Sequence, residues 1–297
     1  MNELRRSLTA ELSLLAVAAL WGGSFVLVHD ALAQISPLEF LAIRFTLATL
    51  VVGFVFRRQL LRFSWAGWKA GLAMGAALTA GFLLQTEGLR VTTASNAGFI
   101  TGLFVVITPL LGALLLRSPV SWEAWVGAAL AALGLYLLSG ASGDWNRGDL
   151  LELGCALAFA CHILLTDRMV RRHPPGGLLV VQLGTLALVA VAGSLASGGL
   201  ALPRAPQVWV ALAYTSVLST AGAFFVQTWA QLHTTPARTA LILTAEPVFA
   251  GLFAFAFGGE RLSPAGLVGA GLIVVAMAGV ELVRLRREAR EAPPHSS

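Results

Sequence analysis

Ten apolar runs, each long enough to cross a bilayer, divide almost the whole chain and limit what it can fold into. A hydrocarbon core about 30 Å thick takes about 20 apolar helical residues per crossing. We therefore predict an all-α integral membrane protein with ten transmembrane helices. The runs cover residues 12–32, 38–56, 66–88, 94–116, 121–139, 149–168, 177–198, 206–231, 236–257 and 264–284.

The composition excludes several other classes of protein. Hydrophobic residues make up 57% of the 297 residues and charged residues only 12%, against roughly a quarter charged in soluble domains, so no soluble catalytic domain is left over. The net charge of +5 comes from dispersed basic residues, whereas a nucleic-acid partner would require them on one face. Cys155 and Cys161 match no common metal pair or disulfide framework. We expect no cofactor, no metal and no nucleic-acid partner.

The basic residues predict the orientation in the membrane. Positively charged loops stay in the cytoplasm. If the N-terminus is inside, most Arg residues fall on cytoplasmic segments, including Arg5, Arg57, Arg171 and Arg286. Both termini are therefore expected in the cytoplasm.

An internal repeat links the two halves of the chain. A shift of 142 positions aligns the third, fourth and fifth runs with the eighth, ninth and tenth without gaps. Because the unit has five crossings, the second unit enters the membrane from the opposite side, which gives two inverted five-helix repeats, 1–142 and 143–297. The most informative matched pairs are Phe82 with Phe224, Gln85 with Gln227, Thr86 with Thr228, Thr92 with Thr234 and Thr93 with Thr235.

Inverted repeats are typical of secondary transporters. They offer two similar packings that open to different sides, with a substrate site near the midplane between the halves. The alternative is a duplicated bundle with a structural role, because fold alone does not define function. The repeat favours alternating access for a small-molecule substrate.

Several short motifs resemble a known family. They are Ala-Leu-Trp-Gly-Gly-Ser-Phe at 19–25, Ile-Arg-Phe at 43–45, Thr-Thr-Ala-Ser-Asn-Ala at 92–97, Ala-Glu-Pro-Val-Phe-Ala at 245–250 and Gly-Glu-Arg-Leu at 259–262. In order and spacing they resemble the EamA-type drug/metabolite transporters. The resemblance implies two inverted five-helix repeats and export of small metabolites or toxic compounds across the bacterial plasma (inner) membrane. It does not name a substrate.

One departure from the family pattern is visible in the first half. Arg117 and Ser118 stand where the second half has Gly259 and Glu260. That loop signature is therefore present only once.

Two ionisable residues near the start of the chain are candidates for coupling or gating. A charge near the bilayer centre costs at least about 2.5 kcal/mol on insertion scales, so each is a functional hypothesis. Arg44 and Asp30 lie at similar depth on either side of the turn at Pro37. We expect them to face one another, either as a structural ion pair or in a gating or substrate-binding role.

Glu246 is the third candidate for coupling. It lies near the middle of the ninth run, directly before Pro247, which removes a backbone donor and favours a bend there. Desolvation disfavours the charged form of a carboxyl group, which suits proton uptake and release during transport. The alternative is a protonated Glu held by neighbouring groups for packing.

Uncharged and aromatic residues are candidates for substrate contact. A Trp near the midplane lies outside the interfacial belt where tryptophans usually gather, so Trp21 is expected in the cavity. His162 is either a hydrogen-bonded core residue or a cavity residue. The substrate-binding candidates are Trp21, Ser24, Phe25, Asn96, Phe99, Thr101, His162, Tyr214, Thr220 and Phe224.

Small residues are frequent in the fifth and tenth runs, among them Gly127, Gly134, Gly269 and Gly271. Such residues let membrane helices approach closely. They predict either an internal seam between the halves or the face of a homodimer.

The motifs that are missing restrict the function further. The sequence carries no Walker-type loop, so any coupling must come from a proton, another ion or exchange. It also carries no His-Glu-x-x-His or Gly-x-Ser-x-Gly motif, so we do not expect an enzyme. The prediction is an exporter of small metabolites, amino acids or drug-like compounds, with proton coupling as one of the options. The alternative is a flippase for lipid or lipid-linked headgroups.

Overall fold

The computed structural model describes residues 2–32, 34–88, 91–92, 94–117, 120–140, 146–199, 202–258 and 263–291. Every element in these ranges is a helix, as the apolar runs predict. The first half contains α1 (Asn2–Leu32), α2 (Pro37–Val55), α3 (Arg57–Leu61), α4 (Trp65–Gly88), α5 (Ala94–Gly102), α6 (Phe104–Leu116) and α7 (Trp122–Ser139). The second half contains α8 (Arg147–Val170), α9 (Pro175–Ala196), α10 (Pro206–Tyr214), η1 (Thr215–Gly222), α11 (Ala223–Ala230), α12 (Pro236–Leu243), α13 (Glu246–Gly258) and α14 (Pro264–Glu291).

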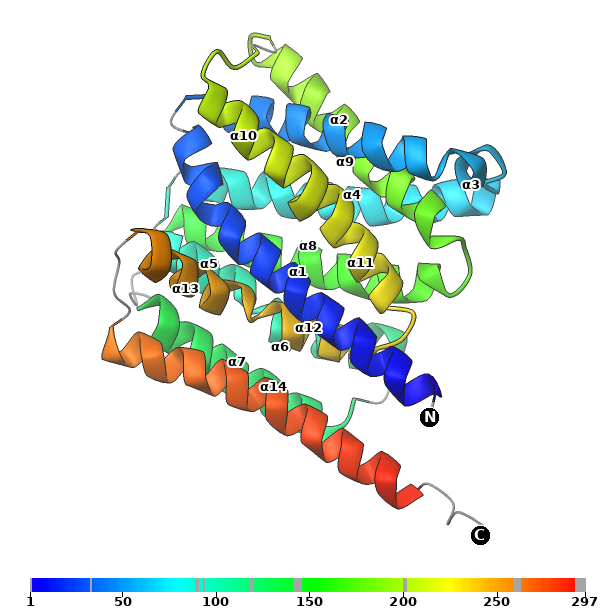
Figure 1. The fold of residues 1–297 in the computed structure, drawn as a ribbon, viewed down its shortest axis with the longest axis vertical. Coiled ribbons are helices and arrows are strands. Elements are labelled where there is room, and N and C mark those ends of the chain that lie inside the picture. The colour runs from blue at the N-terminus through cyan, green and yellow to red at the C-terminus, as the bar shows by residue number, and fades with distance from the viewer. Residues whose placement is uncertain are drawn as a thin grey trace.

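The long helices form one bundle in which the two halves interlock (Figure 1). Helix α2 packs against α9, α4 against α8 and α9, and α7 against α14, so the main contacts join one half to the other. Both termini leave the same end of the bundle in Figure 1, as an even number of crossings requires. We call the opposite end the outer end.

Nine helical segments of the described residues are long and apolar enough to cross a membrane. The predicted ninth crossing, 236–257, is not among them because turn residues Thr244 and Ala245 divide it into α12 and α13. Together these two half-helices form the ninth crossing, which brings the number of crossings among the described residues to ten. The ten-helix prediction is therefore confirmed, with the ninth crossing made of two half-helices.

The broken ninth crossing has a counterpart in the first half. The fourth crossing is interrupted at Leu103, between α5 and α6. The shift of 142 positions that relates the halves carries α6, residues 104–116, onto α13, residues 246–258. Interrupted helices at corresponding positions are typical of inverted-repeat transporters, whose binding sites use the ends of half-helices.

Local sequence explains where the helices around the site begin. Ser36 caps α2 by accepting from the Glu39 backbone N–H, the Glu39 side chain accepts from the Ser36 N–H, and Pro37 occupies the first turn. Such capping boxes satisfy backbone donors that have no partner within the helix. The start of α2 is thereby fixed, and Arg44 lies about two turns further along it.

The eighth crossing contains a distortion that the third lacks. Helix α4 is α-helical throughout, whereas η1 is a π-helical segment between α10 and α11. The N–H of Ala223, directly after η1, donates to the carbonyl of Leu218, five residues back. Such segments are rare and are frequent at functional sites. In η1 the hydroxyl-bearing residues Thr215, Ser216, Ser219 and Thr220 are all buried.

Glycines form a tight seam between α7 and α14. A Cβ on Gly269 would lie 2.4 Å from the carbonyl oxygen of Gly134, and a Cβ on Gly134 would lie 2.7 Å from that of Gly269. Gly271, two residues further along α14, has open space around its Cα. The sequence left open an internal seam between the halves or the face of a homodimer. Gly134 and Gly269 form the internal seam.

We expect Gly269→Val to destabilise the protein because the new side chain would displace the backbone of α7. Overpacking of this kind typically costs about 1–3 kcal/mol. Thermal unfolding in detergent checks this, with Gly271→Val as the matched control on the same helix. Equal unfolding temperatures for the two variants would contradict the seam.

Candidate functional site

Arg44 lies in the interior of the bundle and binds the other half of the chain. Its residue is only 7% exposed. The Nε atom donates a hydrogen bond of 2.7 Å to Oγ1 of Thr220 in η1. The guanidinium carbon lies 5.4 Å from the ring centroid of Phe45 and 5.7 Å from that of Phe82, within the range of cation–π attraction. The guanidinium is therefore held by one hydroxyl and two rings.

Glu246 is the first residue of α13, directly after the break in the ninth crossing. This end of α13 lies against α1, because a Cβ on Gly22 would come within 2.7 Å of the Glu246 carbonyl oxygen and the Ala250 nitrogen. The side chains of Glu246 and Arg44 interact electrostatically. These two described residues nevertheless form no direct ion pair. The interior thus presents one basic and one acidic side chain, from different halves of the chain.

Trp21 connects α1 to the same π-helical segment. Its Nε1 donates to the carbonyl oxygen of Ser219 at 2.7 Å. Its ring packs on Phe224, with centroids 5.3 Å apart, and the Tyr214 hydroxyl donates to the Leu20 carbonyl at 3.1 Å. The π-helical segment η1 thus provides a backbone carbonyl for Trp21 of α1 and a side-chain hydroxyl for Arg44 of α2.

His162 belongs to a hydrogen-bonded chain beside this site. Its Nε2 lies 2.7 Å from Oε1 of Gln182, whose Nε2 donates to Thr228 Oγ1 at 3.4 Å. Thr228 in turn donates to the carbonyl of Phe224 at 2.6 Å, and the His162 ring meets the Phe224 ring edge-on at 6.0 Å. His162 is 3% exposed. These contacts fit the interpretation of His162 as a hydrogen-bonded core residue.

The structure brings together some of the predicted residues and separates others. The side chains or backbone of five of them meet around η1: Trp21, Arg44, Tyr214, Thr220 and Phe224. Glu246 interacts electrostatically with Arg44. Ser24 donates to the carbonyl of Trp21 in its own helix. Phe99 packs on Tyr136 of α7, and Thr101 donates to Glu152 of α8.

The expected pairing of Arg44 with Asp30 stays a prediction. The side chains of Phe25, Asp30 and Asn96 lie outside the described residues, although each position falls in a helix. The partners that the structure gives Arg44 are Thr220, the two rings and Glu246.

The sequence reasoning missed three contributors to the site. They are Phe82, which packs on Arg44, the backbone of Ser219, and Gln182. Gln182 is a single amide in the apolar run 177–198, a signal that could have identified it. Phe82 and Ser219 carry no comparable signal. Phe82 resembles an ordinary core residue in the sequence, and Ser219 acts through its backbone carbonyl.

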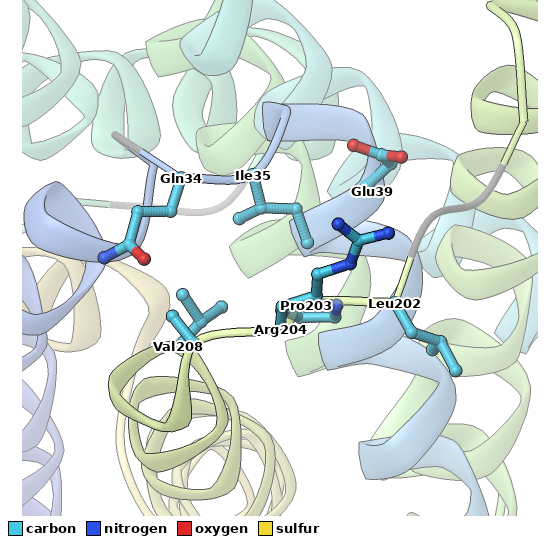
Figure 2. Close-up of a pocket in the computed structure, with 8 residues that line it drawn as sticks. Gln34, Ile35, Glu39, Leu202, Pro203, Arg204 and Val208 are labelled. Atoms are coloured by element: carbon cyan, nitrogen blue, oxygen red, sulfur yellow. The ribbon is translucent and has the colours of Figure 1, made fainter.

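A pocket opens at the outer end of the bundle (Figure 2). Its volume is about 460 Å³, and its lining comes from the segment between α1 and α2, the start of α2, the segment before α10 and α10 itself. In Figure 2 the Arg204 side chain extends toward Glu39. The pocket therefore offers groups of both charges at the start of α2. Arg44 lies about two turns further along the same helix.

Comparisons with known proteins agree with this architecture. The EamA-like transporter family matches residues 8–140 and again residues 146–282. An uncharacterized transporter of Archaeoglobus fulgidus is 35% identical over 279 residues, which are 93% of this chain and 87% of that protein. The threonine/homoserine exporter RhtA of Escherichia coli is 31% identical over 179 residues, 59% of this chain and 58% of that exporter. A crystal structure with 19% identity aligns with a TM-score of 0.80, covering 94% of this chain and 99% of that chain, which shows the shared fold.

The doubled family match, the helices that can span a membrane and the interrupted crossings together define a multi-pass membrane transporter with two related halves. Proteins of this class handle small-molecule substrates within the bilayer. The chain belongs to the EamA-like transporter family, so the resemblance of its sequence motifs is confirmed.

Proposed function

We propose that the protein is a secondary transporter that exports small zwitterionic metabolites, amino acids foremost, by alternating access. The observation that supports this most is the opposed pair Arg44 and Glu246, which come from different halves and attract each other without a direct ion pair. A guanidinium binds a carboxylate through charge-assisted hydrogen bonds, and a carboxylate binds an ammonium group. A zwitterion satisfies both.

The similarity to RhtA supports the choice of amino acids. The name of that exporter gives threonine and homoserine as its substrates, and both compounds carry a carboxylate and an ammonium group. Their short polar side chains would suit neighbours such as the Tyr214 hydroxyl and the Trp21 ring.

Alternating access is supported by the way the halves meet. The hydrogen bonds from Trp21 and Arg44 to η1 cross between the halves, so a rocking motion can break and remake them. The interrupted crossings place half-helix ends where such motion would open or close a path. Glu246 would couple transport to protons by binding an ammonium group in one state and a proton in the other. In this proposal the outer end faces away from the cytoplasm of a bacterial cell, and both termini are cytoplasmic.

Release from proteoliposomes tests the proposed function. Vesicles are preloaded with amino acids, cationic drugs and neutral metabolites, and the released compounds are identified by mass spectrometry with and without a pH gradient. We expect selective release of amino acids above protein-free vesicles, with faster release under the gradient. A parallel sample with fluorescently labelled zwitterionic lipid measures flipping. Lipid flipping without release of any soluble compound would replace the proposal with a flippase.

A further inference from the structure

A second group of buried acidic residues lies on α8 near the outer end. Asp149 and Glu152 follow the start of α8 one turn apart, and they are 1% and 0% exposed. Thr92 donates a short hydrogen bond to Asp149, and Thr101 of α5 donates to Oε2 of Glu152 at 2.6 Å. The group therefore joins the first helix of the second half to the segments around the fourth crossing of the first half.

The two carboxyl groups have different surroundings. Asp149 completes the cap of α8, because its Oδ2 accepts from the Asn146 N–H at 2.8 Å. The Oε1 atom of Glu152 is buried and has no hydrogen-bond partner among the described residues. It is turned toward Gly88, where a Cβ would lie 2.6 Å away. Burial of a polar atom without a partner is costly, so Oε1 needs a proton or another ligand.

The charges around Glu152 point to a proton. Among the described residues, the titratable groups that interact electrostatically with it are Asp149 and Cys155, both on α8, and neither is a cation. Helix α4 adds Glu87, which is exposed, and Lys69, which is exposed near the opposite end of that helix. Helix α5 contributes the neutral hydroxyl of Thr101, and Arg238 of α12 lies beside Glu11. Two buried like charges without a cation are strongly unfavourable. One proton on Glu152 removes this conflict and turns one oxygen into a donor.

Glu11 and Glu123, two other buried carboxyl groups of the described chain, have a cation beside them, and so does the partly buried Glu246. Glu11 lies 3.6 Å from an Arg238 nitrogen. Glu123 pairs with Arg287, and Glu246 interacts with Arg44. Glu152, like its neighbour Asp149, has no such cation among the described residues, and unlike Asp149 it keeps one carboxyl oxygen without a hydrogen-bond partner there.

A short path leads from Glu152 toward the central site. The Thr101 hydroxyl that contacts Glu152 also lies 3.9 Å from Sγ of Cys155. Cys155 interacts electrostatically with both Glu152 and Glu246. Glu152 and Glu246 therefore both act on Cys155, which lies about one turn further along α8 than Glu152.

We propose that Glu152 is a proton-binding site that takes up a proton from the outer end and exchanges it with Glu246. In this step the O–H bond of the Glu152 carboxyl group breaks, and the Glu246 carboxylate gains that proton. Chains of acidic residues within membrane helices often serve as proton relays. The transport consequence of this inference rests on the proposed function, but the proton site itself does not.

Infrared spectroscopy of the reconstituted protein tests the proton site directly. We expect the wild type to show the carbonyl stretch of a protonated carboxylic acid, and Glu152→Gln to lose it. Thr101→Val should shift the band because it removes the hydrogen bond to Oε2. Glu87→Gln, which changes an exposed carboxyl group of α4, is the matched control and should leave the band intact. If Glu152→Gln does not fold, the wild-type band and its shift in Thr101→Val still decide the question.

Two spectroscopic results would overturn the proposal. One is an unchanged band in folded Glu152→Gln or in Thr101→Val. The other is a band that disappears when sodium or potassium replaces a bulky organic cation, because Glu152 would then bind a metal cation. Both results are independent of whether the protein transports amino acids.

Transport assays distinguish a failure of the proton path from a failure of the proposed function. If the wild type exports amino acids, Glu152→Gln should keep exchange of internal for external substrate and an unchanged KM, while release loses its stimulation by the pH gradient. Retained stimulation in this variant would contradict the proton path. Absence of amino-acid release from the wild type would contradict the proposed function, while the infrared result would still stand.

Discussion

Arg44→Gln is expected to weaken substrate binding about 10- to 150-fold, because it removes a charge-assisted contact worth about 1.5–3 kcal/mol. Glutamine keeps a donor for Thr220 but cannot pair with a carboxylate. Arg44→Lys should recover part of the affinity, since it keeps the charge but not the planar fork. Competition against a radiolabelled amino acid bound to the purified protein measures each variant.

Two control measurements make the test of Arg44 specific. Arg58→Gln removes an exposed arginine of α3 and should leave the affinity unchanged, which controls for net charge. A thermal unfolding scan shows whether the loss of the rings' contact with the guanidinium has destabilised the fold. Wild-type affinity in folded Arg44→Gln would exclude a role in binding.

Glu246→Gln is expected to abolish the stimulation of release by a pH gradient and also to weaken substrate binding. The amide cannot exchange a proton, and it offers no charge to an ammonium group. Release under a gradient should fall to the rate without one. Combined loss of affinity and stimulation distinguishes this variant from Glu152→Gln, which should lose stimulation alone.

The control for Glu246→Gln is again Glu87→Gln, because Glu87 is exposed near the end of α4. It should behave as the wild type in release with and without the gradient. Gradient-stimulated release that persists in folded Glu246→Gln would leave Glu246 a structural role only.

The membrane architecture could be predicted from the sequence because it depends on run length and on an odd repeat unit. Apolar runs of about 20 residues have few alternatives in lipid. The break in the ninth crossing was partly visible, since Pro247 follows Glu246. The matching break at Leu103 was not, because no proline adjoins it and Gly102, directly before it, is one of 31 glycines in the chain.

The site could be predicted only in part. Intramembrane position identified Arg44, Glu246 and Trp21, because each is costly or unusual at its depth. Their partners depend on how helices pack, and the π-helical segment at Ser219 and Thr220 follows from no local motif. The sequence predicts Asp30 as the partner of Arg44, which stays a prediction. It does not predict the hydrogen bond from Arg44 to Thr220 or its electrostatic interaction with Glu246.

Glu152 escaped the sequence analysis for an identifiable reason. It lies within the first two turns of α8, where an acidic residue is expected to favour the positive end of the helix dipole. Only the packing of Gly88 and Thr101 against it shows that its carboxyl group is buried. An acidic residue near a helix start can therefore be a cap, as Asp149 is, or an interior group.

Competition by chemically blocked analogues tests most directly whether Arg44 and Glu246 form a site for zwitterions. Binding of a labelled amino acid is measured against the same compound with its carboxylate amidated and, separately, with its amino group acetylated. We predict that both analogues bind at least about tenfold more weakly to the wild type, a loss of about 1.4 kcal/mol each. In Arg44→Gln the penalty for amidation should disappear, while the penalty for acetylation remains. Analogues that compete as well as the free amino acid would contradict a site that recognises both charges.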